Sequence, residues 1–438
     1  TQESHLFFGR EGQSDDVVEL LAKNNFAAVI GASGSGKSSL MYCGILPVLF
    51  GGFIDGINSS WHNVISRPGS NPIDNLSDAL VESVNGADKI TLKKQITSTV
   101  LRGSSLGLIE AIKQIRRPKN ENVLIVIDQF EELFRFQRES KIPNAENEAL
   151  AFIKLLVNAV NQNELPIYVM LTMRSDFIGD CAQYPELTGM INKSHYLVPQ
   201  MTRDNLRDAI VGPVAVGGGA ISTRLVEELL NGVGDNPDQL PILQHALMRT
   251  WGHWVDEGAV GDLDLKHYDA IGGMEQALSM HANEAFDELS QDQKKLCERI
   301  FKTLTEKGLD NRGIRHPSTV REVSEVSGGS IKEITNVVDK FRIEGRSFIS
   351  PGIDKEITAS TILDISHESL MRVWQRLTNW VDDEAGSIQM YTRLAEAAGQ
   401  YQVGKVGLWR PPDLQLALAW REKQQPNLSW AQRYDPAF

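Results

Sequence analysis

The residues best suited to chemistry form the run GASGSGKS at positions 31–38. It follows a short apolar run, FAAVI at 26–30, and precedes a predicted helix. This succession of strand, loop and helix is the context that the phosphate-binding pattern G-x-x-x-x-G-K-S requires. Glycines let successive backbone N–H groups face phosphate oxygens, and the helix N-terminus adds partial positive charge. The run therefore predicts a nucleotide-binding loop.

Two side chains of this loop have distinct expected roles. Lys37 is expected to reach the β- and γ-phosphates of ATP, and Ser38 is expected to ligate Mg²⁺. The expected nucleotide-binding residues of the loop are Gly31, Ser33, Gly34, Ser35, Gly36, Lys37, Ser38 and Ser39. An accidental match is the alternative, and the flanking strand and helix argue against it.

A second apolar run, NVLIVID at 122–128, ends in an acid. Asp128 is expected to hold the Mg²⁺ ion, directly or through water. Glu131 and Glu132 follow, where a carboxylate can orient the attacking water, and Glu131 is the first choice for that role. The alternative is that one or both are solvated acids at the start of a helix. Which glutamate is catalytic stays open.

A third apolar run, PIYVMLTM at 166–173, is followed by Arg174. An arginine at the carboxyl tip of a strand beside the phosphate-binding strand points at the nucleotide crevice. Arg174 is therefore a candidate sensor of the γ-phosphate, and an ion pair with Asp176 or another surface acid is the alternative. The predicted catalytic residues are Lys37, Asp128, Glu131, Glu132 and Arg174.

These residues need a sheet that brings the carboxyl ends of several strands together. Residues 1–198 alternate between strand and helix patterns, which predicts a parallel sheet with helices on both faces. The expected strands are 26–31, 61–66, 123–128, 167–173 and 195–198. The expected helices are 13–23, 38–49, 72–85, 105–117 and 146–162. Residues 86–104, rich in polar and small side chains, are expected to form a surface excursion.

From residue 199 to about 280 the pattern predicts a small all-helical domain. Thr202 is suited to cap a helix through Ile210, and a second helix fits 222–232. Pro241 is expected to open a third helix, because proline is tolerated in the first turn. The expected apolar face of this helix contains Leu240, Leu243, Leu247 and Trp251.

Residues 281–385 predict three helices, 281–307, 317–327 and 330–345, and then two short strands at 346–350 and 361–365. This is the winged-helix pattern, a helix-turn-helix variant with a hairpin wing. Its third helix has nearly balanced charge, with Lys332, Lys340, Arg342 and Arg346 against Glu333, Asp339 and Glu344. A winged helix that packs within the protein is therefore favoured over one that binds DNA. Residues 386–438, with Trp409, Trp420 and Trp430, are expected to form a helical connector.

The bulk composition excludes several classes of protein. The net charge of −13 over 438 residues argues against a nonspecific nucleic-acid binder. The three cysteines, Cys43, Cys181 and Cys297, are far apart and odd in number, which argues against a disulfide framework and fits a reducing, cytoplasmic location. No apolar run is long enough to span a membrane. The chain begins at Thr1 without a methionine, so we expect a processed or trimmed N-terminus.

The whole set of motifs resembles the STAND class of signal-transduction NTPases. The motifs are FGRE at 8–11, GASGSGKSSL, DQFEELF, MRSDF, LPILQHAL and SHESL. They are most similar to the bacterial "novel STAND" branch, which is NACHT/NB-ARC-like and often fused to WD-repeat sensors. The expected fold is an α/β P-loop NTPase (parallel sheet, ASCE/AAA-like) over 1–198, followed by an all-helical lid domain over 199–280 and a winged-helix domain over 281–385.

The resemblance also implies a nucleotide clamped by all three domains. It places Phe8, Gly9 and Arg10 over the adenine and Pro241 against the base or sugar. His367 would contact the β-phosphate of ADP, as the histidine of the related "MHD" motif does. The wording here is Ser366-His367-Glu368, so only the histidine carries over. A helix cap with Ser366 as N-cap is the alternative, and both roles are compatible.

The implied function is a slow ATPase that works as a switch with ATP or ADP and Mg²⁺. ADP holds a closed, autoinhibited form, and ATP favours a self-associated form that activates an effector. The N-terminal effector and C-terminal sensor are expected outside this chain segment, in prokaryotic defence or stress signalling. One alternative is an AAA-like ATPase motor, for which Arg135 and Arg138 are possible arginine fingers. A second alternative is a nucleotide-regulated winged-helix DNA-binding protein.

Overall fold

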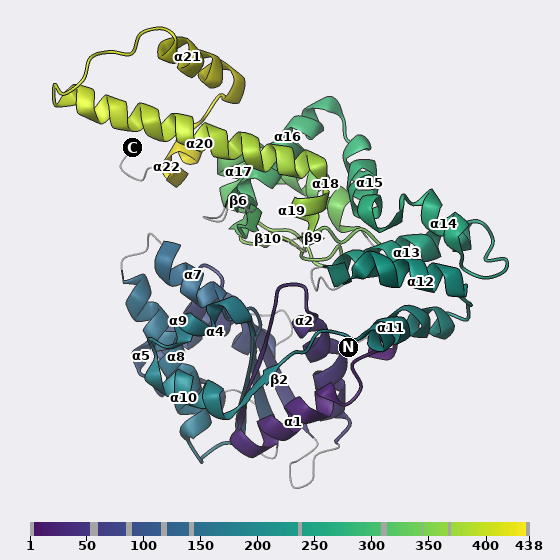
Figure 1. Cartoon of the computed structure of the whole chain (residues 1–438). Coiled ribbons are helices and arrows are strands. Elements are labelled where there is room, and N and C mark those ends of the chain that lie inside the picture. Colours follow the sequence, from purple (N-terminus) through teal and green to yellow (C-terminus); the bar gives the residue numbers. More distant parts are fainter. Residues whose placement is uncertain are drawn as a thin grey trace. The chain divides into compact units, whose positions relative to one another are not determined.

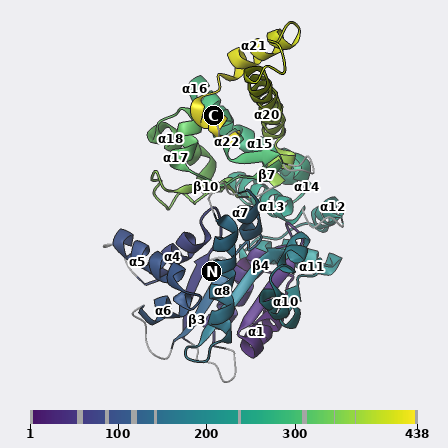
Figure 2. The ribbon, with the colours of Figure 1, turned by 90° about the vertical axis from the view of Figure 1, so that its left-hand side faces the viewer.

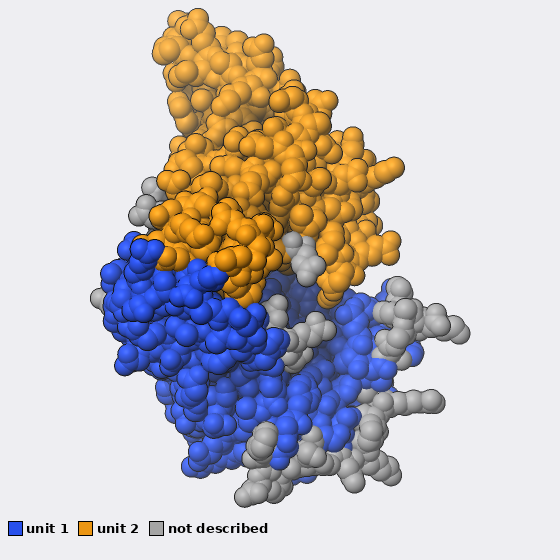
Figure 3. All heavy atoms as spheres, turned by 90° about the vertical axis from the view of Figure 1, so that its right-hand side faces the viewer, with its two compact units in different colours: residues 1–240, 261–263 blue, residues 241–260, 264–438 orange. Residues whose placement is uncertain are grey.

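The computed structural model describes residues 4–52, 60–84, 90–114, 121–139, 144–234, 239–307, 313–343, 345–366 and 369–434. The chain divides into two compact units (Figure 3). The first unit contains Thr1–Leu240 and Gly261–Leu263, and the second contains Pro241–Val260 and Asp264–Phe438. The predicted division into four parts, at 198, 280 and 385, stays a prediction.

The first unit is built on a parallel sheet of five strands in the order β2-β3-β4-β1-β5. The strands are β1 (Phe26–Gly31), β2 (Trp61–Ser66), β3 (Asn122–Ile127), β4 (Ile167–Arg174) and β5 (His195–Leu197). Every residue of β1 and β3 is buried, as the continuous apolar runs predict for strands covered on both faces. The expected strands and the parallel sheet are confirmed.

Helices cover both faces of this sheet (Figure 2). Alternate residues of β1 enter two different cores, with Ala28 and Ile30 in one and Ala27 and Val29 in the other. The first core takes side chains from α4 (Pro72–Glu82), α6 (Gly107–Gln114), α7 (Glu132–Glu139), α8 (Ala145–Asn161) and α10 (Pro185–Lys193). The second takes them from α1 (Gln13–Asn24), η2 (Leu40–Ile45) and α3 (Leu46–Phe50).

The prediction of a surface excursion at 86–104 is wrong for its larger part, because α5 (Ile90–Gly103) is a helix. Its attachment is mostly polar, which hid the helical pattern. Lys94 forms ion pairs with Asp78 and Glu82, and Arg102 forms one with Asp74. Three further helices were not predicted: α7, α10 and the single turn α9 (Ile178–Cys181), which follows the 3-10 turn η3 (Ser175–Phe177).

Two helices continue the first unit beyond the sheet. Thr202 caps α11 (Arg203–Val216) through a reciprocal capping box with Asn205, as its position predicts. This helix runs six residues past its expected end at Ile210 and includes Pro213. The second helix, α12 (Thr223–Val233), agrees with the expected 222–232.

The segment before α1 packs against α11. It begins with a short 3-10 turn, η1 (Ser4–Leu6). A Cβ on Gly212 of α11 would stand 2.5 Å from the Phe8 ring, so only glycine admits the ring there. Gly9 has a φ of +78°, and a Cβ on it would stand 2.2 Å from the Asn205 carbonyl oxygen. Two glycines thus bring the lead-in and α11 into direct contact.

The second unit is mainly helical (Figure 1). Its first helices are α13 (Leu240–Asp256), α14 (Leu265–Ala270) and α15 (Gly273–Asp287). Pro241 lies in the first turn of α13, as predicted. The predicted apolar face is wrong by about one position, because Trp254 is buried while Leu247 and Trp251 are half-buried. The buried residues of this helix are Ile242, Leu243, Ala246, Thr250 and Trp254.

A winged helix follows, made of α16 (Gln291–Thr303), α17 (Val320–Ser327), α18 (Ile331–Arg342) and an antiparallel sheet. The sheet has the order β8-β10-β9, with β8 (Ser318–Thr319), β9 (Ile349–Ser350) and β10 (Ile362–Ile365). The single helix expected at 281–307 is in fact two, α15 and α16, because Ser290 starts a new helix with a capping box. A strand, β6 (Thr305–Lys307), occupies the end of that range and pairs in antiparallel fashion with β7 (Gly313–Arg315).

Aromatic side chains fill the centre of the winged helix. Trp374 is fully buried, makes ring contacts with Phe301, Phe341 and Trp380, and donates its Nε1–H to Asn283 Oδ1 at 2.9 Å. The remaining helices are α19 (Ser369–Val373), α20 (Gln375–Gln402), α21 (Asp413–Gln424) and α22 (Leu428–Tyr434). Trp430 of α22 donates to Glu384 of α20 at 2.6 Å, so α22 folds back against α20.

Cys43, Cys181 and Cys297 are free thiols. None of the helices in the described ranges has the length and apolar character that a membrane crossing needs.

We predict that Gly9→Ala destabilises the first unit more than Gly12→Ala does. Both glycines have φ near +80°, so each alanine pays a left-handed backbone cost of about 1–2 kcal/mol. Nothing lies within 4 Å of a Cβ on Gly12, whereas Gly9 meets the Asn205 carbonyl. Gly9→Ala therefore adds an overpacking cost of roughly 1–3 kcal/mol. Thermal unfolding of the two variants beside the parent measures the difference, and equal losses would contradict the contact.

Candidate functional site

The phosphate-binding loop joins β1 to α2 (Lys37–Ser39) at the carboxyl edge of the sheet. Gly34 and Gly36 have φ of +70° and +83°, the left-handed conformation that glycine adopts without strain. A Cβ on Gly31 would stand 2.8 Å from Ser35 Oγ, so this position also needs glycine. Ser35 is buried, Ser33 lies half-buried in the turn, and Ser39 is exposed at the end of α2. The loop thus has the backbone that the sequence predicts.

The Lys37 ammonium lies back over this loop. Its Nζ donates to the carbonyl oxygens of Gly31 at 3.0 Å and Ala32 at 2.7 Å. Burial lowers the pKa of Lys37, and the neighbouring charge of Arg174 lowers it further, while Glu131 and Asp128 oppose the shift. These interactions place Lys37 in the electrostatic field of three predicted site residues.

Asp128 follows β3 directly, and its side chain has no contact with solvent. Its Oδ1 accepts hydrogen bonds from Ser38 Oγ at 3.0 Å and Thr172 Oγ1 at 2.6 Å. Its Oδ2 accepts from Arg67, from Nε at 3.1 Å and from Nη2 at 2.9 Å. The predicted pair of Ser38 and Asp128 therefore lies together, although 90 residues separate the two in the chain.

The two glutamates occupy different environments. Glu131 is buried, and its Oε2 accepts a hydrogen bond from the Arg174 backbone N–H at 3.2 Å. Burial raises the pKa of this carboxyl above its usual range, against the opposing charge of Lys37. Glu132 is half-buried at the start of α7, and its Oε2 accepts from the Gly69 N–H at 3.0 Å. Glu131 thus faces the phosphate-binding lysine, and Glu132 braces the segment after β2.

Arg174 ends β4 beside the loop strand β1, with its backbone paired opposite Gly31. Its guanidinium forms an ion pair with Asp176, from Nη2 to Oδ2 at 2.6 Å and from Nε to Oδ1 at 3.2 Å. This is the alternative that the sequence left open for Arg174. The pair is partly exposed, and the sensor role stays a prediction.

The lead-in residues hold the loop from outside. Arg10 is buried, and it donates from Nη2 to the Ser35 carbonyl at 2.5 Å and from Nη1 to the Pro199 carbonyl at 2.9 Å. It therefore ties the phosphate-binding loop to the segment that leads into α11. Burial lowers the pKa of Arg10, and its carbonyl contacts suit a positioning residue. The contact of Phe8, Gly9 or Arg10 with a base stays a prediction.

Two predicted site residues are not tested by the described structure. Pro241 belongs to the second compact unit, so its contact with the nucleotide stays a prediction. His367 lies outside the described residues, so its predicted contact with the β-phosphate also stays a prediction.

Two residues of the site were missed from the sequence, Arg67 and Thr172. Arg67 is the first residue after β2, and Thr172 lies within β4. A signal for Arg67 existed, because a residue that follows a parallel strand lies at the same edge as the phosphate loop. The sequence did not reveal that β2 is the neighbour of β3, and this neighbour relation is what places Arg67 on Asp128.

The residues present suit a Mg²⁺ ion bound together with a nucleotide. Ser38 and Asp128 offer hydroxyl and carboxylate oxygens, the hard donors that Mg²⁺ prefers, and phosphate and water complete its shell in such sites. Within the described ranges, no group of three or more His, Cys, Asp or Glu side chains is arranged to hold a metal by itself. The donor set therefore fits a metal that arrives with phosphate.

The chain was compared with known proteins. No curated protein matches the sequence significantly. Among solved structures, the Aeropyrum pernix ORC1 protein in complex with DNA is similar at 14% identity, over 86% of this chain and 93% of that chain, with a TM-score of 0.45. The Aeropyrum pernix ORC2 protein (ADPNP–ADP complexes) has 11% identity, coverage of 86% and 95%, and a TM-score of 0.45. A Walker-type ATPase of Pyrococcus abyssi has 12% identity, coverage of 84% and 96%, and a TM-score of 0.36.

The family comparison covers most of the chain. The family model described as Novel STAND NTPase 1 matches residues 1–406, which include the phosphate-binding loop, Asp128 and Arg174. With the parallel sheet, the loop and the winged helix in place, the chain belongs to the Novel STAND NTPase 1 family of P-loop NTPases.

Proposed function

We propose that this protein is an ATP/ADP-dependent signalling switch with a slow Mg²⁺-dependent ATPase activity. ADP holds a closed, autoinhibited form. ATP favours an open form that self-associates and activates an N-terminal effector, in response to a C-terminal sensor. The setting that fits such a switch is prokaryotic defence or stress signalling in the cytoplasm.

The observation that carries the proposal is the cluster of Lys37, Ser38, Asp128 and Glu131 at one edge of the sheet in a chain of this family. Lys37 supplies positive charge for phosphate oxygens, and Ser38 with Asp128 supplies oxygen donors. A bound Mg²⁺ ion would neutralise charge on the phosphates. Glu131, with a pKa raised by burial, is suited to accept a proton from an attacking water.

A switch needs a difference in affinity between two forms. A few kcal/mol of differential binding is enough to exchange the populations of a closed and an open form. Arg10 supports such coupling within the first unit, because one guanidinium contacts both the loop carbonyl of Ser35 and the carbonyl of Pro199. A change at the loop is therefore transmitted to the segment that starts α11.

The motor alternative has little support from the two candidate arginine fingers. Arg138 forms an ion pair with Asp180, and Arg135 lies over the Phe177 ring at 5.6 Å. A finger must reach the γ-phosphate of a neighbouring subunit, and both side chains already have partners in their own chain.

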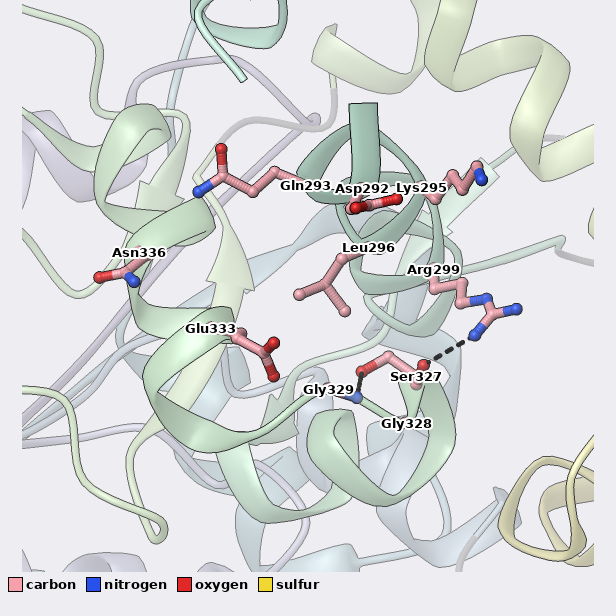
Figure 4. Close-up of a pocket in the computed structure, with 10 residues that line it drawn as sticks. All are labelled: Asp292, Gln293, Lys295, Leu296, Arg299, Ser327, Gly328, Gly329, Glu333 and Asn336. Atoms are coloured by element: carbon pink, nitrogen blue, oxygen red, sulfur yellow. Dashed lines mark hydrogen bonds between the residues drawn. The ribbon is translucent and has the colours of Figure 1, made fainter. Parts of the chain in front are cut away.

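The DNA-binding alternative is weakened by the charges of the winged helix. Arg342 is buried and donates to the carbonyls of Pro351, Gly352 and Lys355, which fastens the turn of the wing. Lys340 and Arg346 both form ion pairs with Glu288. Figure 4 shows that the hollow beside the turn between α17 and α18 carries charges of both signs, from Lys295 and Arg299 and from Asp292 and Glu333.

The proposal is tested by the nucleotide that the purified protein carries and by its turnover. We expect ADP at roughly one per chain and slow steady-state hydrolysis that DNA does not stimulate. Lys37→Ala, which removes the phosphate-binding ammonium, should carry no nucleotide. A site without nucleotide together with rapid turnover would favour the motor, and stimulation by DNA would favour the DNA-binding regulator.

We predict that His367→Ala weakens ADP retention by roughly tenfold or more, because a hydrogen bond to a charged group is lost. The variant should also shift toward the self-associated state. Dissociation of a fluorescent ADP analogue and light scattering measure the two effects. A variant that retains ADP as the parent does and stays monomeric would contradict the predicted contact of His367 with the β-phosphate of ADP. Ser366→Ala controls for the loss of a helix cap.

We predict that Glu131→Gln lowers ATP turnover by roughly 10²–10³-fold with little change in ATP affinity, because the general base is removed. Glu132→Gln should have a smaller effect on turnover and a larger effect on stability, since Glu132 accepts from the Gly69 N–H. Single-turnover hydrolysis and thermal unfolding separate the two. The opposite ranking of turnover would assign catalysis to Glu132.

A further inference from the structure

Arg67 reaches Asp128 because of how two strands pair. In the parallel register of β2 and β3, Ser66 lies opposite Ile127, and the Asp128 N–H donates to the Ser66 carbonyl at 2.9 Å. The next residue of each strand, Arg67 and Asp128, therefore emerges at the same edge.

The carboxylate of Asp128 is divided between two sets of donors. Oδ1 accepts hydrogen bonds from the hydroxyls of Ser38 and Thr172, and Oδ2 accepts hydrogen bonds from two N–H groups of Arg67. The Asp128 side chain is 0% exposed, while that of Arg67 is 44% exposed. The Arg67 guanidinium thus lies between Oδ2 and the solvent. It is the partly exposed member of the pair.

The backbone that carries Arg67 is held in place. Asn75 Nδ2 donates to the carbonyl of Pro68 at 2.8 Å and to that of Arg67 at 3.3 Å. The Gly69 N–H donates to Glu132 Oε2 at 3.0 Å. These three hydrogen bonds hold the backbone of the segment after β2 beside the sheet edge.

We propose that Arg67 competes with Mg²⁺ for the negative charge of the Asp128 carboxylate and so sets the metal dependence of nucleotide binding. Both cations need the same carboxylate, and a buried charge pairs with one partner at a time at full strength. The inference rests on the proposed function, because the metal is expected to arrive with a bound nucleotide. It concerns a residue that neither the motifs nor the family match assigns.

The electrostatic surroundings support this competition. The guanidinium donates from Nε at 3.1 Å and from Nη2 at 2.9 Å to Asp128 Oδ2. A positive charge this close to the carboxylate would reduce the attraction of the site for a second cation.

The test uses the full chain and three variants. Arg67→Gln removes the charge and keeps a hydrogen-bond donor. Arg67→Lys keeps the charge. Arg138→Gln is the matched control. It also removes one arginine charge from the first unit, but Arg138 pairs with Asp180 and not with Asp128. Binding of a fluorescent ADP analogue is titrated against free Mg²⁺, and thermal unfolding is followed in EDTA and in Mg²⁺ with ADP.

We expect Arg67→Gln to need roughly tenfold less free Mg²⁺ for its half-maximal effect on ADP affinity than the parent. Arg67→Lys and Arg138→Gln should stay close to the parent. In EDTA, Arg67→Gln should unfold at a lower temperature, because the buried carboxylate loses its cation, and Mg²⁺ with ADP should close most of that gap.

An unchanged or higher Mg²⁺ requirement in Arg67→Gln would overturn the competition, as would a loss of stability that Mg²⁺ with ADP does not restore. If Arg67→Lys differs from the parent, the two-pronged hydrogen bonding of the guanidinium matters and its charge does not. That result would also overturn the proposed competition. A parent that binds no ADP analogue with or without Mg²⁺ refutes the switch itself, and that outcome is distinct from all of these.

Discussion

One buried carboxylate, that of Asp128, constrains the arrangement of the first unit. A charge without solvent contact costs several kcal/mol unless hydrogen bonds and an opposite charge compensate it. Here the compensation comes from the phosphate loop through Ser38, from β4 through Thr172, and from the end of β2 through Arg67. Any slip of these segments along the strand axis would separate donor from acceptor. The order of the strands and the position of the loop are therefore coupled to a single side chain.

Much of this unit follows from its sequence because its strands are short and the central ones, β1, β3 and β4, are almost wholly apolar. All five strands and the alternation of strand and helix are visible as runs such as Phe26–Gly31 and Asn122–Ile127. The phosphate loop is visible because its glycines and lysine have fixed spacing. By contrast, α5 is attached to α4 through ion pairs such as Arg102 with Asp74, so apolar periodicity does not reveal it. Arg67 escaped notice because its role depends on which strand lies beside β3, a non-local fact.

The second unit shows where composition is a guide and where it misleads. Two of the basic side chains at the end of the predicted third helix have partners within the unit, since Arg342 donates to carbonyls of the wing and Arg346, which follows α18, pairs with Glu288. The predicted apolar face of α13 was misplaced because Trp251 and Trp254, which lie within one helical turn, both fit an apolar stripe. In the structure it is Trp254 that is buried. The break at Ser290 was missed because the residues on both sides favour helix, and only a capping box separates α15 from α16.

The charges at the sheet edge have one further consequence for a switch. Arg67 pairs with Asp128 and Arg174 with Asp176, and Lys37 donates to the carbonyls of Gly31 and Ala32, so all three cations have partners in the chain before any ligand is considered. A triphosphate with its metal must therefore exchange partners in this set, and every exchange costs part of the binding energy it gains. For the proposed switch, we expect such a site to favour tightly held nucleotide over rapid turnover, because each exchange of partners repeats that cost.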